Sequence, residues 1–383
     1  MATTDHPTAA ALSGASPGQS TASPPRLWFV DNLRTLLTSL VVLHHTAIIY
    51  SGLPLWYYTE QPSSGAVGLG LSVFLLVNQA WFMGAFFLLS GYFTPGSYDR
   101  KGPRAFLRDR LIRLGIPLAV FYFVLNPILC LVSYRGGSPL DTYLDTIGAG
   151  PLWFVLALLV FDGTYAAWRL ATGKRPPRSR TPRPPAFPAV IGFVLVLALA
   201  TYALRIVIPQ GFWAPVIDFP TSAYLPQYIS FFVLGTVAYR RGWFHAITAR
   251  MGWAGLGMAV GATVVFLPLA LVAGPDAWAG HGTLGSLFYA LWDSTFAVGV
   301  VLALLTLFRR RLNAQGPLRR YLSGHAFTVY VIHAFVVTAA GCALGGLALP
   351  TSAKFAIAAV AVLPACFALA APIRRLPGVR LVL

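Results

Sequence analysis

The sequence predicts an all-α, polytopic membrane protein with about ten transmembrane helices. Of its 383 residues, 57% are hydrophobic and only 10% are charged, which is more apolar than a soluble domain of this size needs. The apolar residues also come in runs of about twenty, the length of a helix that crosses a hydrocarbon core ~30 Å thick. The ten predicted segments are 30–51, 67–93, 114–134, 150–171, 188–208, 222–239, 252–274, 284–308, 325–346 and 353–371.

The positions of the basic residues predict the orientation of these helices. With a cytoplasmic N-terminus, 25 of the 28 Lys and Arg residues fall in inner segments, and only Arg135, Arg205 and Lys354 lie outside. This bias predicts that both termini face the cytoplasm of a multi-pass protein in a cell membrane. It also explains the net charge of +17 by topology, so the lipid bilayer is an expected partner and nucleic acid is not.

Composition predicts two regions of different character. Residues 1–25 are mostly Ala, Ser, Thr, Pro and Gly and are expected to form a disordered cytoplasmic tail, whereas 26–383 form one membrane domain. The Pro-rich basic stretch 174–185 within that domain is expected to be a solvated linker. The three cysteines lie in apolar runs without metal-ligand spacing, so no metal is expected.

The first helix carries ionisable residues that are costly in a membrane and therefore point to function. Arg34 and His45 are eleven residues apart, which places them on nearly the same face with a rise of roughly 16 Å. Asp31 is one turn from Arg34 and is expected to pair with it. His44 lies about 100° around the helix from His45. A snorkelling arginine and a packing histidine are the structural alternative for this face.

A second basic feature follows the second segment, in residues 91–118. Arg108, Arg110 and Arg113 alternate with apolar residues at helical spacing, which predicts an interfacial helix between transmembrane helices 2 and 3. Such a helix fits either lipid anchoring or the binding of a phosphate-rich ligand, because guanidinium groups bind phosphate in a bidentate manner.

Other ionisable residues fall inside later segments. His333, Asp162, Asp293 and Arg205 either line a cavity or pair with neighbours, and for the last three pairing is the favoured interpretation. The sequence has no glycine-rich phosphate loop and no serine nucleophile motif.

Several short motifs occur in an order that resembles the integral-membrane acyltransferase 3 family, with the greatest likeness to its glucan succinyltransferase branch. They span about residues 28 to 335. They are Asp31-Asn-Leu-Arg34 with His45 eleven positions after the arginine, Ser90-Gly91, the basic run Phe106 to Pro117, Pro151-Leu-Trp153-Phe154, Phe232-Val-Leu-Gly235 and Tyr330-Val-Ile-His333.

The resemblance implies a membrane-bound O-acyltransferase. Its expected reaction moves an acetyl, succinyl or similar group from cytoplasmic acyl-CoA, a co-substrate, to a hydroxyl of a glycan or another envelope or secreted acceptor. The implied catalytic residues are His45 and Asp31, the latter by orienting Arg34. The implied donor site is Arg34, Arg108, Arg110, Arg113 and Ser90, and the implied acceptor site is Trp153 and His333.

Two alternatives stay open on these residues. His45 acts either as a general base toward the acceptor hydroxyl or through a transient acyl-histidine. A proton-coupled transporter or flippase would use His45, Asp162, Asp293 and His333 as a relay. The acyltransferase is favoured because the basic groups gather at one end and the segments show no repeated halves.

Overall fold

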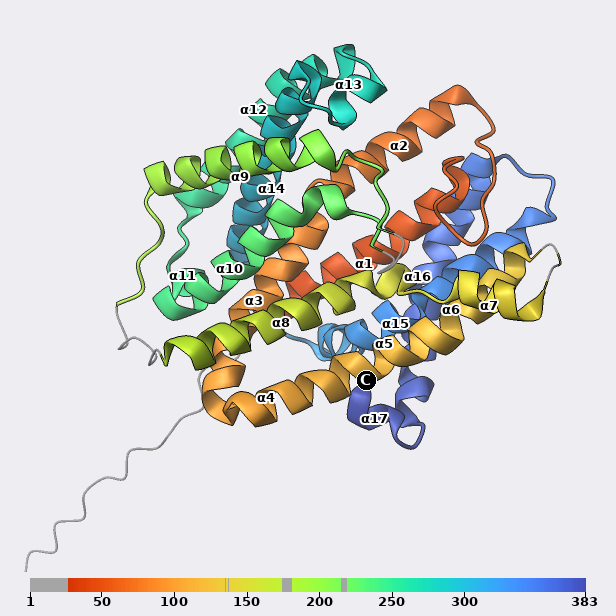
Figure 1. Ribbon diagram of the computed structural model, residues 1–383, viewed down its shortest axis with the longest axis horizontal. Helices are drawn as coiled ribbons and strands as arrows, with labels where there is room; N and C mark the ends of the chain where they lie inside the picture. Colours follow the sequence, from red (N-terminus) through yellow and green to blue (C-terminus); the bar gives the residue numbers. More distant parts are fainter. Residues whose placement is uncertain (1–26, 135, 137, 174–180, 215–218) are drawn as a thin grey trace, which may run out of the picture.

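The computed structural model describes residues 27–134, 136, 138–173, 181–214 and 219–383 as a bundle of helices (Figure 1). Within these residues the only β-structure is an isolated bridge between Ala214 and Phe219, so the all-α prediction is confirmed. Nine helical stretches in this part of the chain are long and apolar enough to cross a membrane. The sixth predicted segment, 222–239, corresponds to α10 (Leu225–Arg241), which has 17 residues.

Eight of the long helices are uninterrupted or nearly so. Three of the four short helices lie between long ones, and the fourth follows the last long helix. The long helices are α1 (Trp28–Tyr50), α3 (Phe82–Lys101), α8 (Trp153–Thr172), α9 (Phe187–Val207), α12 (Ala249–Val272), α14 (Leu284–Arg311), α15 (Pro317–Gly345) and α16 (Thr351–Arg375). The short ones are α7 (Pro139–Thr146), α11 (Trp243–Ala246), α13 (Pro275–Ala279) and α17 (Val379–Val382). The predicted tail, 1–25, and residues 174–180 of the predicted linker lie outside the described residues.

The third span begins earlier than the sequence predicts. α4 (Pro103–Arg110) continues through α5 (Ile116–Val120) and α6 (Asn126–Cys130), with wider π turns at Leu111–Gly115 and Phe121–Leu125 between them. Pro117 and Pro127 cannot donate to the carbonyl four residues earlier, and the π turns before them accommodate that loss. The predicted basic helix between the second and third spans is present as α4. It continues into the third span as one rod, which the sequence did not predict.

The second span is interrupted in its middle. α2 (Gly65–Gln79) ends and α3 begins after Ala80 and Trp81, where the backbone leaves helical geometry. The carbonyl oxygen of Ala80 accepts a 2.7 Å hydrogen bond from Nε2 of Gln227 in α10. A side chain thus replaces a helical partner, which a backbone carbonyl inside a membrane requires.

Two glycines of the sequence motifs pack against each other's helices. A Cβ on Gly91 of α3 would lie 2.1 Å from the carbonyl oxygen of Phe232, and a Cβ on Gly235 of α10 would lie 2.2 Å from that of Leu88. Only glycine permits so close an approach, as in other membrane helix pairs. The Ser90-Gly91 and Phe232-Val-Leu-Gly235 motifs therefore hold α3 and α10 together.

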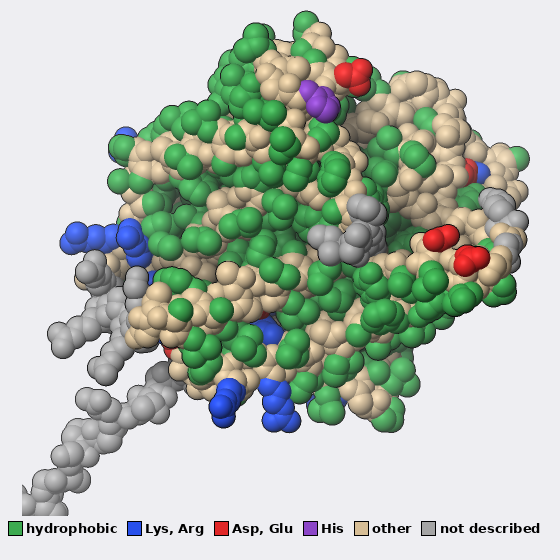
Figure 2. Space-filling model, in the orientation of Figure 1, with side chains coloured by type: hydrophobic (Ala, Val, Ile, Leu, Met, Phe, Trp, Pro, Cys, Tyr) green, Lys and Arg blue, Asp and Glu red, His purple; other side chains and the backbone are tan. Residues whose placement is uncertain are grey.

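Contacts between distant segments agree with the alternation of sides predicted from charge. One end of the bundle joins Asn32 to Leu312, Arg309 to Ile247 and Arg374 to Gly324, and we call it the inner end. The opposite, outer end joins Glu60 to Lys354 and Tyr57 to Asn126. On the face in Figure 2, apolar side chains cover most of the surface, with Lys and Arg mainly at the left and bottom. The direction of the whole bundle in the membrane stays a prediction.

Candidate active site

The expected ion pair between Asp31 and Arg34 is present at the inner end of α1. Oδ1 of Asp31 is 3.8 Å from Nη1 of Arg34, and 40% of the Arg34 side chain is exposed. The guanidinium lies over the ring of Phe93 in α3, 5.3 Å from its centre. Asp31 is separated from His45 by about 21 Å of helix, so it contacts the arginine and not the histidine.

His45 is paired with His333 of α15, 288 residues away in the chain. Nδ1 of His45 lies 2.9 Å from Nε2 of His333, and the ring centres are 4.9 Å apart. Nδ1 of His333 lies 2.6 Å from the carbonyl oxygen of Tyr330, which can only accept a hydrogen bond. A neutral His333 therefore donates from Nδ1 and accepts at Nε2 from the Nδ1–H of His45. This assignment leaves the basic lone pair of His45 on Nε2.

A loop that the sequence did not single out covers this pair. In residues 51–64, the covering loop, the Trp56 ring stacks on His45 with centres 4.3 Å apart and an angle of 22°. Nε1 of Trp56 donates a 3.1 Å hydrogen bond to the hydroxyl of Thr338 in α15. Farther along, Nζ of Lys354 is 2.8 Å from Glu60, which fixes the loop to α16. Trp56 is therefore held over the imidazole from the outer side.

Glu60 also receives a hydrogen bond from within the covering loop. The hydroxyl of Tyr58 donates to Oε1 of Glu60 over 3.0 Å. Burial, together with the Glu60 carboxylate, raises the pKa of Tyr58 to about 12. Tyr58 therefore stays a hydrogen-bond donor to Glu60 across the physiological pH range.

His44 has a different environment from its neighbour. It is only 7% exposed, its Nδ1 is 3.2 Å from Nδ2 of Asn78, and its ring stacks on Phe82 with centres 5.1 Å apart. His44 therefore packs against the interrupted second span, whereas His45 is partly exposed and faces α15. This division supports the assignment of His45, and not His44, to chemistry.

The basic rod meets the bundle through Arg110. Its Nε is 2.9 Å from Oδ2 of Asp162 in α8, whose Oδ1 accepts a 2.7 Å hydrogen bond from the hydroxyl of Thr94. Asp162 is buried, but 22% of the Arg110 side chain is exposed. Arg113 is 64% exposed and pairs with Asp109 over 3.1 Å, and Arg108 is exposed. Of the three predicted donor-site arginines in this rod, only Arg110 is anchored to a buried carboxylate.

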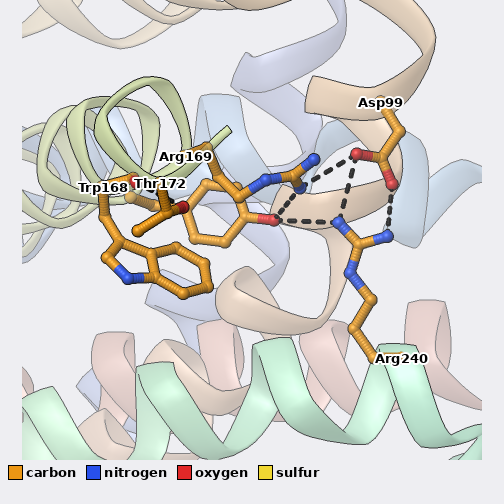
Figure 3. A network of polar contacts seen from close by, with 6 residues as sticks. Asp99, Trp168, Arg169, Thr172 and Arg240 are labelled. Atoms are coloured by element: carbon orange, nitrogen blue, oxygen red, sulfur yellow. Dashed lines mark hydrogen bonds and ion pairs between the residues drawn. The ribbon is translucent and has the colours of Figure 1, made fainter. Parts of the chain in front are cut away.

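A second polar cluster lies one to two turns farther along the same helices (Figure 3). The Asp99 carboxylate of α3 accepts a 3.0 Å hydrogen bond from Nη1 of Arg169 in α8. It also accepts hydrogen bonds from both Nη atoms of Arg240 in α10. The hydroxyl of Tyr165 accepts from both arginines, at 2.8 and 3.1 Å. The cluster joins the inner ends of α3, α8 and α10, which places Asp162 and Arg110 on a fixed frame.

Both α1 and α8 run between the region of Arg110 and Asp162 and the region of His45 and His333. Near His333, the hydroxyl of Tyr330 donates to the carbonyl of Pro151 at the start of α8, and eleven residues later Asp162 binds Arg110. Arg34 and His45 are separated by the same eleven residues in α1, about 16 Å. Arg34 and Asp162 also approach adjacent residues of α3, Phe93 and Thr94. We call Arg34, Arg110 and Asp162 the arginine group, and His45, His333 and Trp56 the histidine group.

Two other predicted site residues lie within the packing of the bundle. Ser90 is partly buried, and its carbonyl oxygen accepts a 3.0 Å hydrogen bond from the Thr94 hydroxyl. Trp153 is 7% exposed and stacks on Tyr228 with ring centres 5.5 Å apart. The predicted roles of Ser90 in donor binding and Trp153 in acceptor binding stay predictions. Trp56 is an aromatic residue in direct contact with His45, a position that Trp153 does not have.

The remaining buried ionisable residues pair with each other, as favoured from the sequence. Nη2 of Arg205 is 2.6 Å from Oδ2 of Asp293, and both side chains are almost fully buried. The guanidinium also lies over the rings of Tyr224 and Tyr289. This pair ties α9 to α14 and is enclosed by aromatic rings.

The arrangement combines guanidinium groups at the inner end with an imidazole farther along α1. The arginine group offers guanidinium nitrogens suited to phosphate, and the histidine group offers one imidazole nitrogen with a lone pair. A thin, extended molecule with phosphates at one end and a reactive carbonyl at the other would match the roughly 16 Å between them.

Comparison with known proteins gives the same family that the motifs resemble. Residues 27–371 match the family described as an acyltransferase domain, of the acyltransferase 3 type. The chain is 27% identical, over 337 residues, to proteins named "Glucans biosynthesis protein C" from Salmonella schwarzengrund, Salmonella typhi and Salmonella typhimurium. Each match covers 82% of this chain and 83% of the relative.

Proposed function

This chain belongs to the acyltransferase 3 family of membrane acyltransferases, and we propose that it moves an acyl group from acyl-CoA to a hydroxyl of a glycan or another envelope acceptor. The proposed acyl group is acetyl, succinyl or one of similar size. The name of the relatives favours a glucan as the acceptor. The observation that carries the proposal is the pair of hydrogen bonds that holds His45 with its Nε2 lone pair unused.

The donor is proposed to enter from the inner end. Its phosphates bind the exposed edges of Arg34 and Arg110, with Arg108 and Arg113 adding positive charge and Ser90 lying on the adjacent turn of α3. Asp31 and Asp162 each hold one of these guanidinium groups in place. The pantetheine arm then extends along α1 and places the thioester near His45.

The chemical step follows from the proton positions in the histidine group. Nε2 of His45 removes the proton of the acceptor hydroxyl as its oxygen attacks the thioester carbonyl carbon. The carbon–sulfur bond then breaks, and the coenzyme A thiolate takes the proton back from His45. His333 supports the transient imidazolium by accepting from its Nδ1–H, a hydrogen bond that strengthens when the donor is charged.

The acceptor is proposed to reach His45 from the outer side, past the covering loop. Trp56 offers an indole face beside the imidazole, and sugar rings commonly stack on such faces. His333, predicted as an acceptor-site residue, contributes through its contact with His45 and not by itself. Trp153 lies deeper, in the aromatic packing around Tyr228.

A transporter or flippase is the alternative of a different class. It would need a relay that joins the buried histidines to the buried carboxylates. Asp162 pairs with Arg110, and Asp293 pairs with Arg205, so both carboxylates are engaged with arginines at other places in the bundle. The family membership also favours the transfer of an acyl group.

The decisive experiment uses the purified protein in proteoliposomes with radiolabelled acetyl-CoA or succinyl-CoA and a soluble glucan. We expect label in the glucan with one donor, and none with His45→Ala. Labelled ester in the glucan is the product of either route. Label trapped on a histidine of the protein when the glucan is left out supports the acyl-histidine route. Binding of neither donor would contradict the proposal and return the transporter to first place.

A further inference from the structure

A cavity of about 810 Å³ lies between α9, α10 and α14. Its walls are apolar side chains from all three helices: Ala189, Val190, Phe193, Phe231, Leu234, Ala238, Val298, Val301, Leu302 and Leu305. Figure 1 shows these helices with the chain that precedes α9 at the inner side. The volume falls in the range of about 300–1,000 Å³ typical of ligand sites.

The inner end of the cavity is lined differently. Arg183, in the chain before α9, and Arg241, the last residue of α10, are its two charged lining residues. The guanidinium of Arg241 lies over the ring of Trp243 at 5.8 Å, and Trp243 also lines the cavity. Arginine and tryptophan side chains occupy this position where hydrocarbon gives way to lipid headgroups.

Aromatic rings close the cavity toward the candidate active site. Phe244 of α11 lines the cavity, is 2% exposed and stacks on Tyr92 with ring centres 4.0 Å apart and an angle of 3°. Phe29 of α1 packs on Phe244, with ring centres 6.2 Å apart. Neither the arginine group nor the histidine group lines the cavity. Its occupant is therefore different from the reacting molecules.

We infer that this cavity binds one phospholipid with a net negative headgroup from the cytoplasmic leaflet, with an acyl chain between α9, α10 and α14. The phosphate lies between Arg183 and Arg241, which come from two different elements and supply planar donors that match its oxygens. The cytoplasmic leaflet is the source of such lipids, and basic residues near its surface attract them. Bound there, the lipid joins the chain before α9 to α10 and α11. The site goes beyond the proposed acyl transfer and does not depend on it.

The test titrates delipidated protein in detergent with phosphatidylglycerol or phosphatidylcholine and counts bound lipids by native mass spectrometry. We expect one tightly held phosphatidylglycerol and at least about tenfold weaker binding of phosphatidylcholine. The double variant Arg183→Ala, Arg241→Ala should lose roughly tenfold or more in affinity for phosphatidylglycerol, since each interfacial arginine contributes about a factor of five. Ala189→Trp should weaken binding of both lipids, because its indole occupies part of the cavity.

Two matched controls separate the cavity from general effects. Ala200→Trp places the same side chain at another exposed alanine of α9, outside the cavity, and should bind lipid as the wild type does. Arg310→Ala, Arg311→Ala removes the same charge from exposed residues at the inner end of α14. Undiminished lipid binding by Ala189→Trp would overturn the site. Equal affinity for the two lipids would overturn the preference for a net negative headgroup. Unchanged affinity of the Arg183→Ala, Arg241→Ala variant for phosphatidylglycerol would overturn the phosphate contact, and a retained mass equal to acyl-CoA would overturn the choice of a lipid.

Discussion

The bundle contains two Asp–Arg pairs with buried carboxylates, and the surroundings of the two pairs differ. Arg205 and Asp293 are 0% and 2% exposed, and aromatic rings enclose the guanidinium. Asp162 is equally buried at 1%, but its partner Arg110 is 22% exposed. The first pair has no route to a ligand in the described part of the chain. The second pair leaves part of the arginine side chain exposed, as the proposed contact with an anion requires.

The tandem histidines repeat this difference over one residue. His44 is enclosed between Asn78 and Phe82, whereas His45 contacts His333 and Trp56 and stays partly exposed. Residue type therefore does not separate structural from functional groups here. The candidate functional residues are distinguished by two features: partial exposure, and a partner that fixes the proton position of His45 or the orientation of Arg110.

The largest expected effect comes from replacing His44 and His45, one at a time, with alanine. His45→Ala should lower acyl transfer by about 10²–10⁴-fold, the usual contribution of a general base, and should lower stability by about 1–3 kcal/mol because it leaves Nε2 of the buried His333 without its partner. His44→Ala should keep most activity but lower stability by about 1–3 kcal/mol, because it leaves the buried Asn78 amide without its partner. Turnover and thermal unfolding of both variants check this. An inactive His44→Ala with an active His45→Ala would reverse the comparison.

The next effect tests whether the arginine and histidine groups work at a fixed separation. An Ala inserted between Thr38 and Ser39 turns Arg34 and His45 apart by ~100° and adds ~1.5 Å, yet α1 still spans the membrane. Activity should fall to background in the proteoliposome assay. Removing Leu40 in the same variant restores the eleven-residue count and should recover part of the rate. Near-normal turnover in the insertion variant would reduce Arg34 to an end anchor.

The sequence predicts the parts of this site that lie on one helix. The eleven-residue spacing in α1 follows from helical periodicity, and the Asp31–Arg34 pair follows from a separation of one turn. The helical spans follow from apolar runs, since a bilayer leaves few alternatives for a run of about twenty residues. Neither inference needs tertiary information.

The partners of these residues depend on tertiary packing, which periodicity does not contain. His333 reaches His45 across 288 residues, and Asp162 reaches Arg110 between different helices. Trp56 lies in a loop without a regular pattern, so no sequence signal marked it. The basic helix was predicted, but its continuation into the third span was not, because the π turns before Pro117 and Pro127 that allow it leave no sequence signal.

Breaking the fully buried Arg205–Asp293 pair is expected to lower stability and to leave donor affinity unchanged. Asp293→Ala leaves Arg205 buried without its carboxylate and should lower the free energy of unfolding by about 3–5 kcal/mol. The double variant Arg205→Met, Asp293→Leu should recover most of that loss, because it removes both charges. Asp162→Asn should be milder in thermal unfolding, since the exposed edge of Arg110 can bind water. Equal destabilisation by both Asp variants would show that both pairs are sealed.

The smallest expected effect concerns Arg110 and Arg113, at the start of the third span. Arg110→Ala should raise the KM for acyl-CoA by about tenfold, because it removes a charge-assisted contact whose geometry Asp162 fixes. Arg113→Ala should raise it only two- to threefold, roughly, since that side chain is 64% exposed and well screened. Arg110→Lys should restore part of the affinity, because lysine keeps the charge and lacks the bidentate fork. A KM unchanged by Arg110→Ala would mean that this pair, like Arg205 and Asp293, only joins helices.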